Sequence, residues 1–364
     1  MFISIGVLTW NEEESIEATL GSLFRQSIFR LVSDRGGKTE VLVVANGCTD
    51  RTQELAQAVF DNSQSTKIKI PEDVRCQVVE LKERGKVNAW NVFVHELSNN
   101  EADYLFLMDA DILVNERDAM WSMLIALETD SFAQVSTDQP VKDVKHGAAS
   151  PLTRLISLGT SKMTQAGSAQ LTGQLYCIRA SMARKIRLPR GLLVEDGFIK
   201  TLVCTDLLTA ESNSNRIART QDASHVFQAY TAIGDVLNNQ KRQKVAQTIT
   251  YFLCEQFLPR LSRDDRYRFA ETVMNRETLD PEWCIRPFKE YVRSTTRFWN
   301  LYPDALTFRF RRLKLLGGLS RIGYFPVAIA GFCVDLITCY QAHRSLRLQQ
   351  VDFWPDTRTK YVAK

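Results

Sequence analysis

Two pairs of carboxylates have a spacing that suits chemistry. Asp109 and Asp111 follow the apolar run YLFLM at residues 104–108, with one residue between them. Because side chains alternate along an extended chain, both carboxylates are expected to point the same way beyond the strand. Paired carboxylates suit Mg²⁺ or Mn²⁺, which takes one or two protein carboxylates and completes its shell with phosphate oxygens and water. A solvated turn gives the same pattern, so this motif needs support from other motifs.

The second pair is Glu195-Asp196, which stands at the start of a helical segment. Acidic residues at a helix amino terminus are stabilised by the helix dipole, and this structural role is compatible with a chemical one. The sequence alone leaves both readings open.

Alternating strand and helix patterns are expected to position these residues. Apolar strand-like runs at residues 2–8, 40–44, 77–81 and 104–108 are separated by helical patterns at 12–26, 50–60 and 85–97. Unbroken apolar strands joined by helices predict an α/β fold whose mostly parallel sheet is flanked by helices on both faces. Ligands of such sheets bind beyond the carboxyl ends of the strands. The segments 11–13, 46–50 and 109–111 all follow strand ends.

The second half has a different pattern. A helix is expected after residue 150, then a strand-like stretch at 171–178, a short helix, the acidic pair and a mostly helical remainder. A chain of 364 residues is long enough for more than one unit. We therefore expect a catalytic domain at residues 1–250 and a helical, basic carboxyl-terminal region at residues 251–364.

Composition narrows the class of protein. A net charge of +4 and the lack of a basic run interleaved with aromatic residues exclude a nucleic-acid module. The eight cysteines form no CxxC pair, so we expect buried free thiols in a reducing compartment. The amino terminus resembles a first strand more than a signal peptide, because no basic segment precedes its short apolar run. These features predict a cytoplasmic protein.

The order of the motifs resembles glycosyltransferase family 2, which has the GT-A fold. The resemblance covers roughly residues 1–250. The matching segments are TWNEEESIEATLGSL, VVANGCTDRT, GKVNAWN, MDADI, LTGQLYCIR and VEDGF.

This resemblance implies a reaction. A family member of this type is an inverting, metal-dependent hexosyltransferase that moves a sugar from a nucleoside diphosphate donor, expected here to be a UDP-sugar, to an acceptor hydroxyl or other nucleophile. The acceptor is not specified by the sequence and is a lipid, saccharide, peptide or small natural product.

The resemblance also implies roles for individual residues. Asp109 and Asp111 would hold Mg²⁺ or Mn²⁺, and Asp196, with Glu195 beside it, would be the general base. Lys86 would lie near the diphosphate as a point charge. The nucleotide pocket would be lined by residues after the first two strands, namely Asn11, Glu13, Asn46 and Asp50.

Three further residues have weaker support. His225 lies where some GT-A enzymes place a third metal ligand or a diphosphate contact. Gln240 and Arg242 stand where processive family members carry QxxRW, but the tryptophan is missing, which disfavours processive synthesis. Both side chains would reach the diphosphate or would lie on a solvated helix face. Ala45 replaces an aspartate common in the family, so one usual contact to the base is missing.

Two rival functions are compatible with parts of the pattern. A metal-dependent nucleotidyltransferase shares the architecture, but the first strand lacks a glycine-rich, basic phosphate loop. A catalytically silent binding protein of the same fold need not keep both acidic pairs, and this chain keeps both.

The carboxyl-terminal region carries an apolar stretch at residues 322–340, interrupted by Pro326 and Asp335. It is marginal for a membrane span, which needs about 20 apolar residues. A packed helix, a helix at the membrane interface and a span are the alternatives. Peripheral contact with the cytoplasmic face of a membrane is one prediction, and an acidic acceptor is another, because the preceding segment is basic. Its basic residues are Arg286, Lys289, Arg293, Arg297, Arg309, Arg311, Arg312, Lys314 and Arg321.

Overall fold

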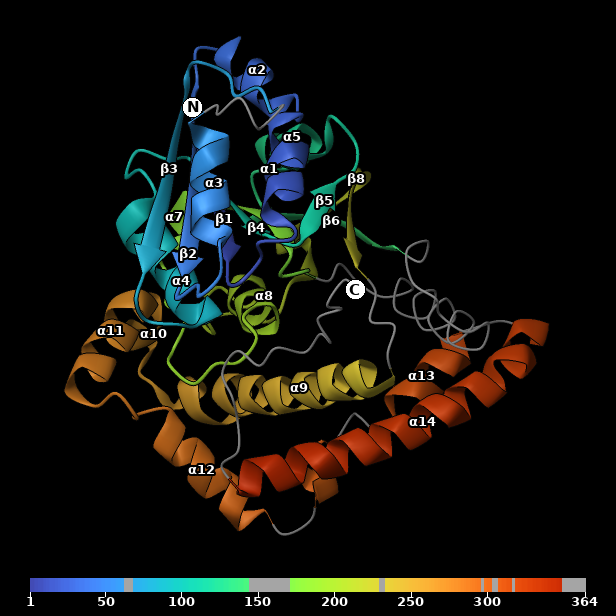
Figure 1. Cartoon of the computed structure of the whole chain (residues 1–364). Coiled ribbons are helices and arrows are strands. Elements are labelled where there is room, and N and C mark those ends of the chain that lie inside the picture. The colour runs from blue at the N-terminus through green and yellow to red at the C-terminus, as the bar shows by residue number, and fades with distance from the viewer. Residues whose placement is uncertain are drawn as a thin grey trace.

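A curled eight-stranded sheet forms the centre of the protein (Figure 1). The computed structural model describes residues 1–61, 68–143, 171–228, 233–295, 298–302, 307–315 and 318–348. In spatial order the strands are β3 (Val74–Leu81), β2 (Lys38–Asn46), β1 (Phe2–Thr9), β4 (Tyr104–Asp109), β7 (Leu175–Arg179), β6 (Val135–Asp143), β8 (Ile217–Gln228) and β5 (Ile112–Val114).

The sheet has a parallel half and a mixed half. β3, β2, β1 and β4 run parallel, as the unbroken apolar runs predict. β7 is antiparallel to both β4 and β6, whereas β6 pairs with β8 in parallel and β5 closes the sheet antiparallel to β8. The strands β5, β6 and β8 were not predicted, because their sequences lack a long apolar run. The remainder after the acidic pair is therefore less purely helical than expected.

Alternate side chains of the parallel strands face two separate cores. Ile3, Ile5 and Val7 face one core, together with the apolar sides of α1 (Ile16–Phe24), α2 (Ile28–Ser33), α3 (Thr52–Phe60) and α5 (Ala119–Thr129). Leu8 and Leu42 face the other, which contains α4 (Lys86–Val92), the π-helix η1 (Phe93–Leu97), α7 (Ala180–Ala183) and α8 (Asp196–Cys204). This alternation is the expected consequence of the two-residue strand period.

The carboxyl-terminal helices extend the second core. α9 (Ile233–Tyr251) runs below the sheet, and the long α14 (Gly318–Arg347) lies against it (Figure 1). Between them come α10 (Arg263–Tyr267), α11 (Phe269–Leu279), α12 (Ile285–Ser294) and α13 (Phe308–Leu315). Short helical turns complete this region, namely η3 (Phe252–Phe257), η4 (Leu258–Arg260) and η5 (Phe298–Leu301), with η2 (Ser214–Arg216) preceding β8.

Candidate active site

Lys86 joins the two acidic motifs. Its ammonium lies 2.7 Å from Oδ1 of Asp109 at the end of β4 and 2.8 Å from Oε1 of Glu195 at the start of α8. It also donates to the carbonyl of Gly173 at 3.1 Å. Residues separated by more than eighty positions in the sequence therefore share one ammonium group.

Burial and charge act in opposite directions on these groups. Burial opposes the charge of Lys86, but Asp109 and Glu195 outweigh it and raise the lysine pKa. Burial raises the pKa of Asp109, and Glu195 adds to this rise while Lys86 works against it. A cation at this place therefore decides whether the carboxylates can all be ionised.

Asp196 occupies the first turn of α8, next to this cluster. One of its carboxylate oxygens accepts the Gly197 N–H at 2.6 Å, which fixes the side chain at the amino terminus of the helix. Burial and the neighbouring charge of Glu195 raise the pKa of Asp196 to about 6, against the opposing effects of the Gly197 N–H, Lys86 and Arg242. A carboxyl group with a pKa near 6 suits proton transfer close to neutral pH.

Gly173 leaves room for this arrangement. A Cβ atom at this position would lie 2.7 Å from Oε1 of Glu195 and 3.3 Å from Cβ of Asp196. The LTGQLYCIR segment thus brings its backbone close to the acidic pair, and only glycine permits that approach without moving Glu195.

Asn11, Glu13 and Asp50 come together in a hydrogen-bonded network after β1 and β2. Asn11 accepts the Thr49 N–H at 2.8 Å, and Glu13 accepts the Arg51 N–H at 3.1 Å. Asp50 accepts from the Glu13 N–H at 3.2 Å. The residues expected to line a nucleotide pocket therefore tie the two strand-end loops together. Asn46, at the end of β2, is fully buried, and neither polar atom of its side chain has a hydrogen-bond partner.

His225 belongs to a buried polar relay on β8. Its Nδ1 lies 2.7 Å from Oδ2 of Asp138 on β6, and its Nε2 lies 3.2 Å from Oε1 of Gln174. The backbone carbonyl of Gln174 accepts the Asp109 N–H at 2.8 Å, so the relay continues to the end of β4. Sequence reasoning gave no role to Asp138 or Gln174. Gln174 lies within a recognised motif, but no local pattern marks Asp138.

The remaining predicted site residues are Arg242, Gln240 and Asp111. Arg242, on α9, is close enough to Asp196 for its charge to lower the pKa of that carboxyl. Gln240 lies on the same helix and is partly exposed. Asp111 is partly exposed between β4 and β5, beyond the strand end.

The ligand set fits a hard cation that relies on its substrate for most ligands. Among the residues that the structure describes, no three His, Cys, Asp or Glu side chains are gathered closely enough to hold a metal by themselves. Asp109 and Asp111 carry carboxylate oxygens, the kind of ligand that Mg²⁺ or Mn²⁺ takes when phosphate oxygens complete the shell. A cation shared with a diphosphate at these two residues stays a prediction.

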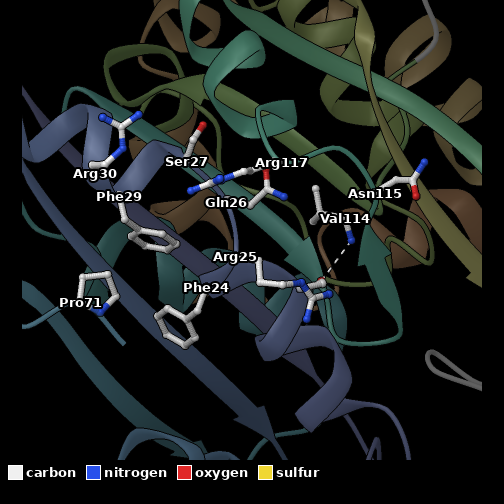
Figure 2. Close-up of a pocket in the computed structure, with 11 residues that line it drawn as sticks. Phe24, Arg25, Gln26, Ser27, Phe29, Arg30, Pro71, Val114, Asn115 and Arg117 are labelled. Atoms are coloured by element: carbon white, nitrogen blue, oxygen red, sulfur yellow. Dashed lines mark hydrogen bonds between the residues drawn. The ribbon is translucent and has the colours of Figure 1, made fainter. Parts of the chain in front are cut away.

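A cavity of about 470 Å³ lies at the other end of α1 and contains none of the predicted site residues. Figure 2 shows that Arg25 and Arg30, which line it, direct their guanidinium groups away from each other. The cavity therefore does not gather these charges around one point. Phe24, Phe29 and Pro71 form an apolar wall.

Residues 4–180 match the sequence profile of "Glycosyl transferase family 2". Over this region, which contains β1 to β7 and the Asp109–Asp111 motif, the chain belongs to glycosyltransferase family 2. No curated protein sequence matches the chain.

One solved structure extends the likeness in fold to most of the chain. A mannosyltransferase from Pyrobaculum calidifontis, solved with GDP-mannose and Mn²⁺, is 15% identical, with 96% of this chain and 88% of that chain covered and a TM-score of 0.54. At this identity the likeness concerns the fold, which is GT-A. TarS from S. aureus, residues 1–349, is 15% identical over 96% of this chain and 92% of that chain, with a TM-score of 0.45. Glucosyl-3-phosphoglycerate synthase from Mycobacterium tuberculosis is 17% identical over 69% of this chain and 78% of that chain, also with a TM-score of 0.45.

Proposed function

We propose that this glycosyltransferase transfers a hexosyl group, with inversion, from a UDP-sugar to an acceptor hydroxyl or other nucleophile. The observation that carries the proposal is the convergence of Asp109 and Glu195 on the ammonium of Lys86, with Asp196 adjacent. Family membership supports sugar transfer, and the mannosyltransferase of similar fold was solved with a nucleotide sugar and Mn²⁺. The choice of uridine follows from the family resemblance.

Each group has a place in a single displacement. Asn11, Glu13 and Asp50 would surround the nucleotide, and Asn46, which is fully buried in this structure, would reach it only after a local shift. Asp109 and Asp111 would hold Mg²⁺ or Mn²⁺ against the diphosphate. When bound, the cation neutralises negative charge on the leaving diphosphate. Asp196 takes the proton of the acceptor while the acceptor atom bonds to the anomeric carbon. The bond from that carbon to the diphosphate breaks on the opposite face, which inverts the configuration.

Lys86, Gln240 and Arg242 would support the diphosphate. Lys86 occupies the space between the carboxylates, so we propose that it turns toward the phosphate oxygens when a divalent cation satisfies Asp109. Guanidinium geometry suits phosphate, which favours Arg242 as a second contact. His225 would be a third metal ligand through Nε2 once Gln174, whose Oε1 lies 3.2 Å from that nitrogen, moves aside, since Nδ1 faces Asp138.

Separate variants test the donor site and the base. Asp111→Asn should abolish Mn²⁺-dependent binding of the donor, because one oxygen ligand loses its charge. Asp196→Asn should leave donor binding intact and stop turnover, because no base takes the acceptor proton. Donor binding is measured by thermal shift and titration calorimetry with UDP-sugars and GDP-mannose, and turnover by release of nucleoside diphosphate. Normal turnover of Asp196→Asn would overturn the base assignment.

A metal-dependent nucleotidyltransferase is the second candidate, and the same assay separates it from sugar transfer. That enzyme releases pyrophosphate from a nucleoside triphosphate, whereas the proposed one releases a nucleoside diphosphate from its sugar. A catalytically silent protein releases neither.

We place the reaction in the cytoplasm, since all eight cysteines are free thiols and five of them are buried.

A further inference from the structure

The outer face of α14 carries a continuous row of exposed apolar side chains. The exposed fractions are 72% for Ile322, 49% for Phe325, 43% for Ile329, 50% for Ile337 and 57% for Tyr340. Cys333 is also exposed and occupies the position in the row between Ile329 and Ile337. Steps of three and four residues place all of these side chains on one side of a helix. Large apolar side chains aligned in this way differ from scattered surface residues and mark an interaction surface.

The opposite face of α14 is fixed to the protein by a buried charge. Asp335, whose side chain is 3% exposed, lies 2.5 Å from Nε of Arg309 on α13 and 3.4 Å from Nζ of Lys244 on α9. Gly331 lets the Arg309 guanidinium cross the helix, because a Cβ atom there would lie 2.5 Å from it. Thr338, Cys339 and other buried residues continue this inner face.

This buried cluster argues against a transmembrane span. Among the described residues, Ser320–Arg347 is the one helix that is long and apolar enough to cross a membrane. Of its most apolar 18-residue stretch, 22% is buried. Asp335 lies near the middle of that helix, where a span would place it at the centre of the bilayer. A charged group there is costly, and removal from its partners would also leave the buried Lys244 and the partly buried Arg309 unpaired.

The charges around the apolar row favour an anionic surface. Arg344 and Arg347 continue the row beyond Tyr340 at the same helical spacing, and both are exposed. Arg311 and Lys314 on α13 are exposed as well. Within the described parts of α13 and α14, the buried Asp335 is the only carboxylate. An apolar row bordered by arginines is the pattern of a helix that lies in the plane of a membrane and binds anionic lipids.

We propose that α14 docks in the plane of an anionic lipid bilayer, with Ile322, Phe325, Ile329, Ile337 and Tyr340 inserted at the interface. Arg344 and Arg347 contact lipid headgroups, while Asp335 stays within the protein. This proposal does not rest on the sugar-transfer reaction, because it uses none of the site residues.

Flotation of the full chain with lipid vesicles tests the docking. The protein should float with vesicles of phosphatidylcholine and phosphatidylglycerol and much less with phosphatidylcholine alone. The triple variant Phe325→Ser, Ile329→Ser, Ile337→Ser should lose flotation. Arg344→Glu with Arg347→Glu should lower the ratio of bound to free protein about tenfold or more, since each basic residue near the surface contributes about 1 kcal/mol. Leu279→Ser, which changes an 85% exposed leucine on α11, is the matched control and should float normally.

Two other outcomes would overturn the proposal. If the triple variant floats normally but changes from dimer to monomer in sedimentation, the apolar row is a contact between two copies of the chain. If the protein resists alkaline carbonate extraction from membranes, α14 spans the bilayer. Circular dichroism melts of every variant show whether the fold is retained, and the double arginine variant keeps the test valid if the triple variant unfolds.

Discussion

At the scale of single residues, the protonation of Asp196 gives the site a predictable pH dependence. A base must be ionised to accept a proton, and the pKa of this carboxyl is raised to about 6. Turnover at saturating donor and Mn²⁺ should therefore rise with pH through about 6 and level off above it.

Arg242 tunes this dependence through its charge. Because Arg242 lowers the pKa of Asp196, its removal in Arg242→Gln should raise that pKa and shift the acid limb of the kcat profile to higher pH. Lys241→Gln removes the same charge from the neighbouring position of α9 and should leave the limb in place. An increased KM for the donor in Arg242→Gln would indicate that Arg242 contacts the diphosphate as well. An acid limb that does not move would show that Asp196 does not control it.

Asp138 is expected to position His225 for the cation. A carboxylate that holds Nδ1 of a metal-binding histidine orients its Nε2 for the metal, and loss of such a partner typically lowers metal affinity 10–100-fold. In this structure Nε2 of His225 lies 3.2 Å from Oε1 of Gln174, so a metal would take the place of that contact. Asp138→Asn should therefore weaken Mn²⁺ binding within about this range in calorimetry with donor present. Asp34→Asn, which changes an exposed carboxylate on the opposite part of the molecule, is the control. Unchanged Mn²⁺ affinity in Asp138→Asn would exclude His225 as a ligand.

At the scale of elements, the loop before β7 fixes the acidic pair. Gly173→Ala should lower kcat about tenfold to a hundredfold, because the new methyl group displaces Glu195 from Lys86 and small misplacements of catalytic groups have effects of this size. Gly234→Ala on α9 meets no atom within 4 Å and should have normal turnover. Equal activity of the two variants would show that the position of Glu195 is unimportant for the reaction.

The parallel half of the fold was predictable from sequence, whereas the mixed half was not. The strands β1, β2 and β4 are buried on both faces and read as apolar runs, so β-strand and strand-end positions followed directly. In contrast, β8 reads IARTQDASHVFQ and is stabilised by pairing with β6 and β5. Pairing of this kind is a tertiary effect with no local signal.

The same limit applied to the site. Recognisable motifs contain all four carboxylates of the candidate site, namely Asp109, Asp111, Glu195 and Asp196. In the structure, Asp109 and Glu195 share Lys86. The relay of Asp138, Gln174 and His225 joins strands that are neighbours only in the folded sheet. The sequence motifs indicated these four carboxylates as candidate site residues, but they did not predict that Lys86 links Asp109 to Glu195.

At the scale of the whole molecule, one apolar core joins the proposed catalytic domain to the carboxyl-terminal helices. The core that includes Leu8 and Leu42 of the sheet continues through Ile249 on α9 to Ala342 and Leu346 on α14. The proposed boundary at residue 250 falls near the end of α9, within this core. The two regions should therefore unfold together, although we propose different functions for them.

The Asp335 cluster provides the test of this coupling. Asp335→Ala leaves the buried Lys244 and the partly buried Arg309 without their partner, which should lower the free energy of unfolding by about 3–5 kcal/mol. Because the core is continuous, the loss should appear equally in two measurements. The free energy of unfolding from urea melts followed by far-ultraviolet circular dichroism should fall by the same amount as the free energy of opening from hydrogen exchange of the β1 amides. Asp280→Ala, which breaks an exposed ion pair with Arg286, should shift neither appreciably. If Asp335→Ala melts α14 and leaves exchange in β1 unchanged, the helical region is an independent unit, and membrane docking through α14 would be mechanically separate from the site on the sheet.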